Sequence, residues 1–214
     1  MRHFSVSTTP NFCLLDRESL RGAVEAYRNH VTEQQPYDVV KRGEGYELRR
    51  YPAHVVAEVA VDADFDQAGN IGFRPLVNYI GGNNSARTSL DMTAPVVQSQ
   101  TLAMTAPVVQ SPGDGQEQVI AFVLPASVGI DSAPIPNDPR VVIREVPPSL
   151  TAVARYSGRW SESSYDHHVA ALRDALAADG LTAVSEPRLA RFDPPFKPWF
   201  LRRNEVHIDV AEAT

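Results

Sequence analysis

Residues 90–99 read LDMTAPVVQS and residues 102–111 read LAMTAPVVQS, so nine of ten positions match at an offset of twelve residues. Valine favours strands, but Pro95 and Pro107 cannot donate a backbone hydrogen bond to a sheet ladder. Each copy is therefore expected on an edge strand or at a β-bulge, where backbone groups and a methionine side chain remain available for other contacts. We interpret the second copy as an extension of a strand hairpin and not as a second binding site.

The composition around this repeat is that of a globular protein, with 43% apolar and 21% charged residues in a chain of 214. The net charge of −6 argues against a nucleic-acid partner, because phosphates favour clustered Lys and Arg. Cys13 is the single cysteine, which excludes a disulfide framework and a thiolate metal cluster. Apolar runs are too short for a membrane span and the start of the sequence lacks a signal-peptide core, so we predict a cytoplasmic protein without a membrane partner.

The chain divides into an N-terminal extension over residues 1–36 and a domain over residues 37–214. Residues 16–34 have the composition of a helix with a weak apolar stripe, and Pro36 ends this segment. From Tyr37 onward the apolar period changes to that of strands. The extension is therefore expected to be partly helical and to contribute little to the core.

The domain reads as two successive strand–strand–helix–strand units. One helix is expected from a cap at Asp64 to Ile80, ending at two glycines, and a second from a cap at Ser161 or Ser163 to residues 179–180. Apolar alternation predicts the remaining elements as strands. The expected strands cover residues 46–51, 55–61, 90–99, 119–124, 141–146, 150–156 and 204–210.

The two units overlay at an offset near 95 residues. Leu48 then falls on Ile143, Phe65 on Trp160 and Val77 on Leu172, although sequence identity is low. The shared pattern predicts a two-fold α+β architecture, in which the strands pool into one sheet or barrel and each unit packs a helix against it.

Catalytic motifs are absent: the sequence contains no phosphate-binding loop, dinucleotide fingerprint, zinc-protease helix or nucleophile elbow. His54 and His207 are expected on solvated strand faces, His207 between two acidic residues. His168 lies on the flank of an apolar helix stripe, where a boundary histidine is the plainer interpretation and a metal ligand the alternative. The pattern thus favours a binding module over an enzyme.

Five segments in order resemble the SOUL family of haem-binding proteins and together span residues 37–210. The Met-Thr-Ala-Pro-Val phrase and the closing Arg-Asn-Glu-Val are the most specific of them. The resemblance implies a distorted antiparallel β-barrel in two pseudo-symmetric halves with two flanking helices, a fold shared with bacterial effector-binding domains of the gyrase-inhibitor type. The matching segments are YELRRY (46–51), NYIGGN (78–83), MTAPV (92–96), ADG (178–180) and RRNEV (202–206).

The resemblance also implies haem as the cofactor, but the family's proposed contacts carry over only in part. Some relatives have a histidine, proposed as the iron ligand, where this sequence has Arg50. The basic positions of the first helix, thought to hold the haem propionates, fall on Asn70 and Asn78, and a pocket methionine falls on Phe73. The apolar wall of the pocket is thus retained, whereas the ligand and the propionate contacts are not.

Other side chains offer substitutes for the missing contacts. Arg50 shares a strand face with Leu48, and its guanidinium suits a carboxylate. Met92 and Met104 carry thioethers that haem iron accepts, although strand methionines mostly fill cores. The candidate contacts are Arg50, Asn70, Phe73, Arg74, Val77, Asn78, Met92 and Met104, and the candidate iron ligand is His168.

The leading hypothesis is non-enzymatic binding of haem or a related tetrapyrrole in a hydrophobic groove, for transport, buffering or delivery. Burying a few hundred Å² of porphyrin yields about 10 kcal/mol before ordering costs, so an iron ligand is not required. The alternative is an effector-binding module for another planar apolar molecule. A third hypothesis, an enzyme that uses or degrades haem, would need a distal acid–base group, for which only His168 is placed. The sequence does not fix the oligomeric state.

Overall fold

The computed structural model describes residues 33–100, 117–194 and 196–211. By internal contacts, residues from Glu33 onward form one compact unit. The predicted helix over residues 16–34 falls almost wholly outside the described residues, as do Met104 and the second copy of the repeat.

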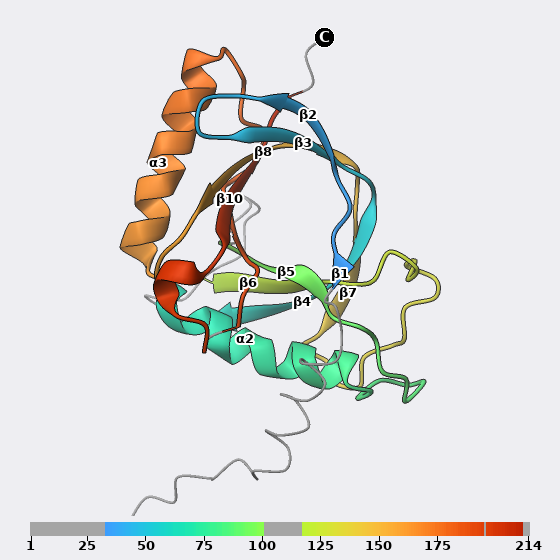
Figure 1. Cartoon of the computed structure of the whole chain (residues 1–214). Helices are drawn as coiled ribbons and strands as arrows, with labels where there is room; N and C mark the ends of the chain where they lie inside the picture. The colour runs from blue at the N-terminus through green and yellow to red at the C-terminus, as the bar shows by residue number, and fades with distance from the viewer. Residues whose placement is uncertain (1–32, 101–116, 195, 212–214) are drawn as a thin grey trace, which may run out of the picture. The chain divides into compact units, whose positions relative to one another are not determined.

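One curled sheet dominates the described unit (Figure 1). Its strands follow the order β2-β3-β8-β10-β9-β5-β6-β4-β7 with antiparallel neighbours, and β1 pairs in parallel with β5. With two helices on its outer side, the sheet forms the expected α+β distorted barrel. The elements are β1 Glu33–Gln34, β2 Asp38–Arg42, β3 Glu47–Tyr51, β4 His54–Asp62, α2 Phe65–Ile80, β5 Thr93–Gln100, β6 Glu117–Val123, β7 Val142–Val146, β8 Ser149–Tyr156, α3 Glu162–Ala178, β9 Arg188–Arg191, the 3-10 helix η1 Trp199–Leu201 and β10 Asn204–Asp209.

The strand order confirms the predicted two-fold arrangement. An offset of 95 residues carries β3 onto β7, β4 onto β8, α2 onto α3 and β5 onto β9. If β2 is left aside, the strand order β3-β8-β10-β9 in one half corresponds to β7-β4-β6-β5 in the other. The pseudo-two-fold axis therefore passes between β9 and β5. We call the first group with α3 the α3 half, and the second group with α2 the α2 half.

The helix α2 lies close to its half of the sheet because small residues face β4 and β6. A Cβ atom at Gly72 would stand 2.6 Å from Ile120 Cγ1, so only glycine fits at this contact. Leu76 and Tyr79 continue the buried stripe into an apolar core that also contains Phe122. The helix spans the predicted range from Asp64, its N-cap, to Ile80.

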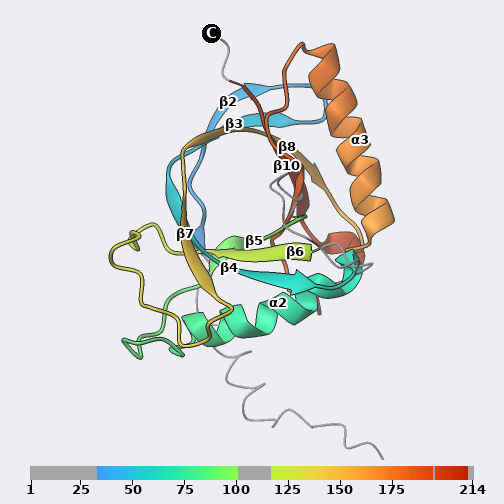
Figure 2. The ribbon, with the colours of Figure 1, turned by 180° about the vertical axis from the view of Figure 1, so that it is seen from behind.

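The second helix, α3, buries Tyr165, Val169, Leu172 and Leu176, as its apolar stripe predicts. Ser161 is its N-cap residue. These side chains meet Leu48, Leu189 and Val206 in a separate apolar core beneath α3. Each helix therefore has its own core on the outer face of the sheet (Figure 2).

The first copy of the repeat forms β5. The register with β6 shifts between Thr93 and Val96, so Pro95 lies at an irregularity of the ladder, as expected for a bulge. The alternative of an edge strand is wrong, because β5 lies between β9 and β6. The bulge removes the need for a donor at Pro95 and lets the strand continue inside the sheet.

Three strands and a side-chain orientation were not predicted correctly. The strand β1 lies at the end of the segment over residues 16–34 that was predicted as a helix. The strands β2 and β9 carry mixed charged and apolar residues without clear alternation, so neither shows the periodicity of a strand. His207 was expected in solvent but is only 6% exposed. Because the sheet curls, its inner face is covered as well as its outer face, and the alternate residues of β10 are buried on both sides.

Candidate functional site

The outward side of α2 gathers the predicted helix residues. Asn70, Phe73, Arg74 and Asn78 are exposed, and Val77 is half-buried. Phe73 is 39% exposed, yet its ring packs against the ring of buried Phe122 at a centroid distance of 5.2 Å. The core therefore holds this apolar side chain at the surface, where a ligand can contact it.

Of the other predicted contact residues, some lie in the same half of the sheet as α2 and others do not. Met92 is half-buried and packs, like Val77, against the core of the α2 half. Arg50 instead lies exposed on β3, in the α3 half, paired with Asp38 of β2 and Leu150 of β8. The ligand contacts predicted from the sequence therefore lie in both halves of the sheet.

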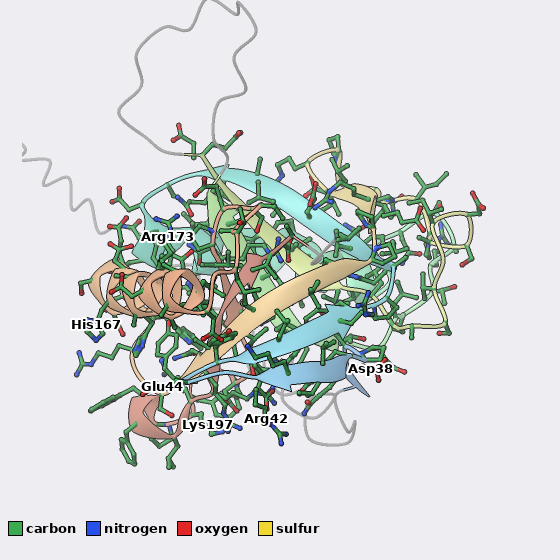
Figure 3. All side chains as sticks on the ribbon, turned by 90° about the horizontal axis from the view of Figure 1, so that it is seen from above. Asp38, Arg42, Glu44, His167, Arg173 and Lys197 are labelled. Carbon is green, nitrogen blue, oxygen red and sulfur yellow. The ribbon has the colours of Figure 1, made fainter. Side chains whose placement is uncertain are left out.

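His168, the candidate iron ligand, lies half-buried on α3 with its ring stacked on Tyr156 at 3.9 Å between centroids. Burial lowers its pKa, and the neighbouring His167 adds to this effect. The side chain of His167 itself is exposed on α3 (Figure 3). The imidazole of His168 is therefore neutral near pH 7, the form that binds a metal. Within residues 33–100, 117–194 and 196–211, no group of three His, Cys, Asp or Glu side chains is arranged to hold a metal ion.

An exposed aromatic segment was missed from the sequence. Phe196, Trp199, Phe200 and Leu201, which we call the aromatic loop, are between 49% and 70% exposed. Figures 1 and 2 both place η1 beside the first turns of α2 and α3. The run FKPWFL, with four large apolar residues in six, was the available signal, because such residues seldom cluster in an exposed loop.

Basic side chains surround the aromatic loop. The guanidinium of Arg159 lies 5.5 Å from the ring centroid of Trp199. Lys197 extends beside η1, with its Nζ 2.7 Å from Asp193 Oδ1 (Figure 3). Arg202 packs over the Trp160 ring at 4.3 Å. The loop therefore combines apolar surface with cations, a pairing that suits an apolar molecule carrying acidic groups.

The first turns of the two helices are joined directly. The backbone N–H of Glu162, at the start of α3, donates to Asp66 Oδ1 of α2 at 2.9 Å. The rings of Phe65 and Tyr165 stack at a centroid distance of 5.0 Å just inside this link. The aromatic loop thus lies next to a junction that fixes both helix ends.

The inner face of the α3 half carries a buried charged network. Glu205 accepts hydrogen bonds from Arg49 Nη1 at 2.9 Å, from Arg203 Nη2 at 2.7 Å and from His207 Nε2 at 3.0 Å. Burial alone would raise the pKa of Glu205, but His207 and the two arginines outweigh it and lower the pKa to about 2. Burial also lowers the pKa of His207, so we assign it as a neutral donor.

The lowered pKa of Glu205 makes the pair of His207 and Glu205 poorly suited to general acid–base catalysis. Two arginines hold Glu205 as a carboxylate, and a general acid or base would need a pKa near the working pH. Tyr51 completes the cluster, its ring stacked on His207 at 5.9 Å. The network is therefore a structural element that satisfies charges buried by the curl of the sheet.

The fold itself recurs in solved structures. The C-terminal domain of EcmrR aligns with a TM-score of 0.58 at 11% identity, covering 83% of this chain and 99% of that chain. A hydrolase from Listeria innocua aligns with a TM-score of 0.54 at 11% identity, covering 87% of this chain and 97% of that one. At such identities the likeness extends to the fold alone. By its fold, this chain belongs to a class of two-fold α+β modules with a curled sheet.

Sequence comparison is more specific. The profile of the SOUL heme-binding protein family matches residues 32–209, and the chain belongs to this family. Heme-binding protein 1 of Xenopus laevis is 27% identical over 193 residues, covering 89% of this chain and 94% of the relative. Heme-binding protein 2 of Homo sapiens is 27% identical over 185 residues, covering 79% and 84%. In the described ranges, no helix is long and apolar enough to cross a membrane.

Proposed function

We propose that this chain binds haem or a related tetrapyrrole without catalysing a reaction, and that residues 37–214 are the binding domain. The observation that carries the proposal is the exposed aromatic surface, Phe73 on α2 with the aromatic loop at the helix starts, on the fold of a haem-binding family. A cytoplasmic role in transport, buffering or delivery fits the single cysteine, since secreted domains commonly carry disulfides.

The residues present suit a flat apolar ligand. Aromatic side chains offer faces for stacking on a porphyrin, and covering a few hundred Å² yields about 10 kcal/mol before ordering costs. The hydrophobic groove predicted beside α2 would be formed by Phe73, Val77 and Met92. His168 is the proposed axial ligand when iron is present, with Met92 as a second candidate, and haem supplies the iron chemistry.

Titration with haemin tests this proposal. We expect a saturable shift of the Soret band at one equivalent, and Phe73→Ala and Trp199→Ala each to weaken binding about tenfold, because each loses about 1.5 kcal/mol of apolar contact. Ile135→Ala is the matched control, since Ile135 is 72% exposed on a different loop. A Soret shift no larger than with an unrelated protein would end the proposal.

The second candidate is binding of another planar apolar molecule. It is favoured by Asn70 and Asn78, uncharged residues exposed where the family's basic propionate contacts are expected. Tight binding of an apolar dye that haemin fails to displace would favour this candidate, and displacement by haemin would favour the tetrapyrrole.

A further inference from the structure

A buried arginine near the two helix starts, Arg191, forms no ion pair with a carboxylate of the residues that the structure describes. Arg191 of β9 is 8% exposed, and the single side-chain hydrogen bond described for it runs from Nη2 to the amide oxygen of Gln98. Its guanidinium packs against α2, where a Cβ at Gly69 would stand 2.3 Å from Nη1. It also lies 4.9 Å from the Trp160 ring centroid. Burying a guanidinium that is not paired with a carboxylate is costly, so this arrangement needs an explanation.

Two polar groups in this region lack hydrogen-bond partners. In the described part of the chain, three buried side-chain polar atoms are unsatisfied: Arg191 Nε, the Tyr156 hydroxyl and Thr93 Oγ1. Both Arg191 Nε–H and Tyr156 O–H are donors, and buried donors are normally satisfied. Tyr156, like Arg191, is 8% exposed.

The register of the sheet places these two donors in one row. Asn204 of β10 pairs with Tyr156 of β8 on one side and with Arg191 of β9 on the other. Directly opposed residues point to the same face, and two strand spacings separate their backbones by about 10 Å. The side chains of Tyr156 and Arg191 therefore lie on the same face of the sheet, and each affects the pKa of the other.

The local charge favours an anion. Burial lowers the pKa of Arg191 to about 10, and Arg202 adds a second positive charge on the Trp160 ring. Asp66 faces Arg191 from α2, but its Oδ1 accepts from the backbone of Glu162. His168, stacked on Tyr156, contributes no negative charge.

We propose that Arg191 and Tyr156 form an anion-binding pair that accepts a carboxylate group of the bound ligand. One carboxylate oxygen would accept the Arg191 Nε–H and the Tyr156 O–H, satisfying both donors and neutralising the buried cation. The assignment of this carboxylate to a tetrapyrrole rests on the proposed function. Movement of Trp160, which is half-buried, would open the approach to Arg191.

The test compares haemin, which has two carboxylates, with its dimethyl ester, which has none. We expect the full chain to bind haemin about tenfold more tightly than the diester, since a charge-assisted hydrogen bond is worth roughly this factor. Arg191→Gln is expected to abolish this preference and Tyr156→Phe to reduce it severalfold. Arg140→Gln, the same charge change at an exposed arginine, is expected to leave it unchanged.

The variants and a second probe keep the test decisive. If Arg191→Gln fails to fold, Tyr156→Phe carries the test, because the ring that stacks on His168 is kept. Equal binding of haemin and diester by the unmodified chain overturns the proposal, as does a preference that survives both substitutions. If neither is bound, the proposed function fails, and benzoate decides the anion site: thermal stabilisation lost in Tyr156→Phe supports it, and no stabilisation overturns it.

Discussion

The α2 half and the α3 half share one strand order but bury different chemistry on the inner face of the sheet. In the α3 half, β3 and β10 place Arg49 and Glu205 there as a charged network. In the α2 half, Val56 and Val123 pack together on the inner face, and the ion pair on that face, Arg144 with Glu58, is more exposed to solvent. The two-fold topology therefore fixes where side chains lie, whereas each half assigns them its own role.

The outer layers differ in the same way. Glycine lets α2 lie close to the sheet, and Phe73 reaches the surface from the core. The buried side of α3 consists of bulky residues such as Leu172 and Leu176. We infer that the α2 half and the aromatic loop provide the apolar binding surface, whereas the α3 half holds the charged network and the polar side chains proposed to contact the ligand, His168, Tyr156 and Arg191.

The largest expected difference between the halves concerns their inner faces. Glu205→Ala removes the carboxylate shared by buried Arg49 and half-buried Arg203 and leaves Arg49 only its pairing with Glu47, so we expect a loss of about 3–5 kcal/mol of stability. Val123→Ala in the α2 half removes only apolar contact and should cost about 2 kcal/mol. Urea unfolding of both variants measures the two losses, and equal losses would contradict the division between the halves.

The network should also give the protein a specific acid sensitivity. The pKa of Glu205 is about 2 in the folded state and about 4.5 when unfolded, so the unfolded chain binds the proton more tightly. About 3 kcal/mol of stability is thus fully present above pH 5 and lost as the pH falls toward 2. Unfolding free energies measured from pH 6 to 2 check this, and Glu205→Gln should flatten the profile.

The close packing of α2 can be tested at Gly72. Alanine there places a Cβ 2.6 Å from Ile120 Cγ1, and we expect a net destabilisation of about 1–2 kcal/mol despite the better helix propensity of alanine. Gly129→Ala, whose nearest neighbour would be 3.8 Å away, is the control for thermal unfolding and should change little.

The smallest expected effect belongs to His168. Its replacement by alanine removes the stack on Tyr156, which should cost about 1 kcal/mol in thermal unfolding. The Soret spectrum of the same variant with haemin tests iron ligation. A spectrum identical to that of the unmodified chain would remove His168 as the proposed ligand.

Much of the fold could be predicted from local pattern. The stripe of α3, the caps and the offset between units follow from the spacing of apolar residues with Gly and Pro. The bulge at Pro95 follows from its missing donor. The candidate site was harder to predict from the sequence, because its residues come from α2, β8, β9 and the aromatic loop, which are distant from one another along the chain.

The neighbours Arg49 and Arg50 illustrate the limit. The sequence favoured Arg50, which shares a strand face with Leu48, whereas the structure exposes Arg50 and buries Arg49 against Glu205. Strand alternation assigns these residues to opposite faces but does not reveal that the sheet covers both. His207 was misjudged for the same reason.

The sequence by itself determined both helices, most of the strands, the two-fold order and the family, because periodicity, proline and glycine act within a few residues of the chain. The tertiary structure decided which polar side chains are buried, since only the curl of the sheet removes the inner face from water. It also decided that Tyr156 and Arg191 share one row, because strand register joins residues far apart in the chain.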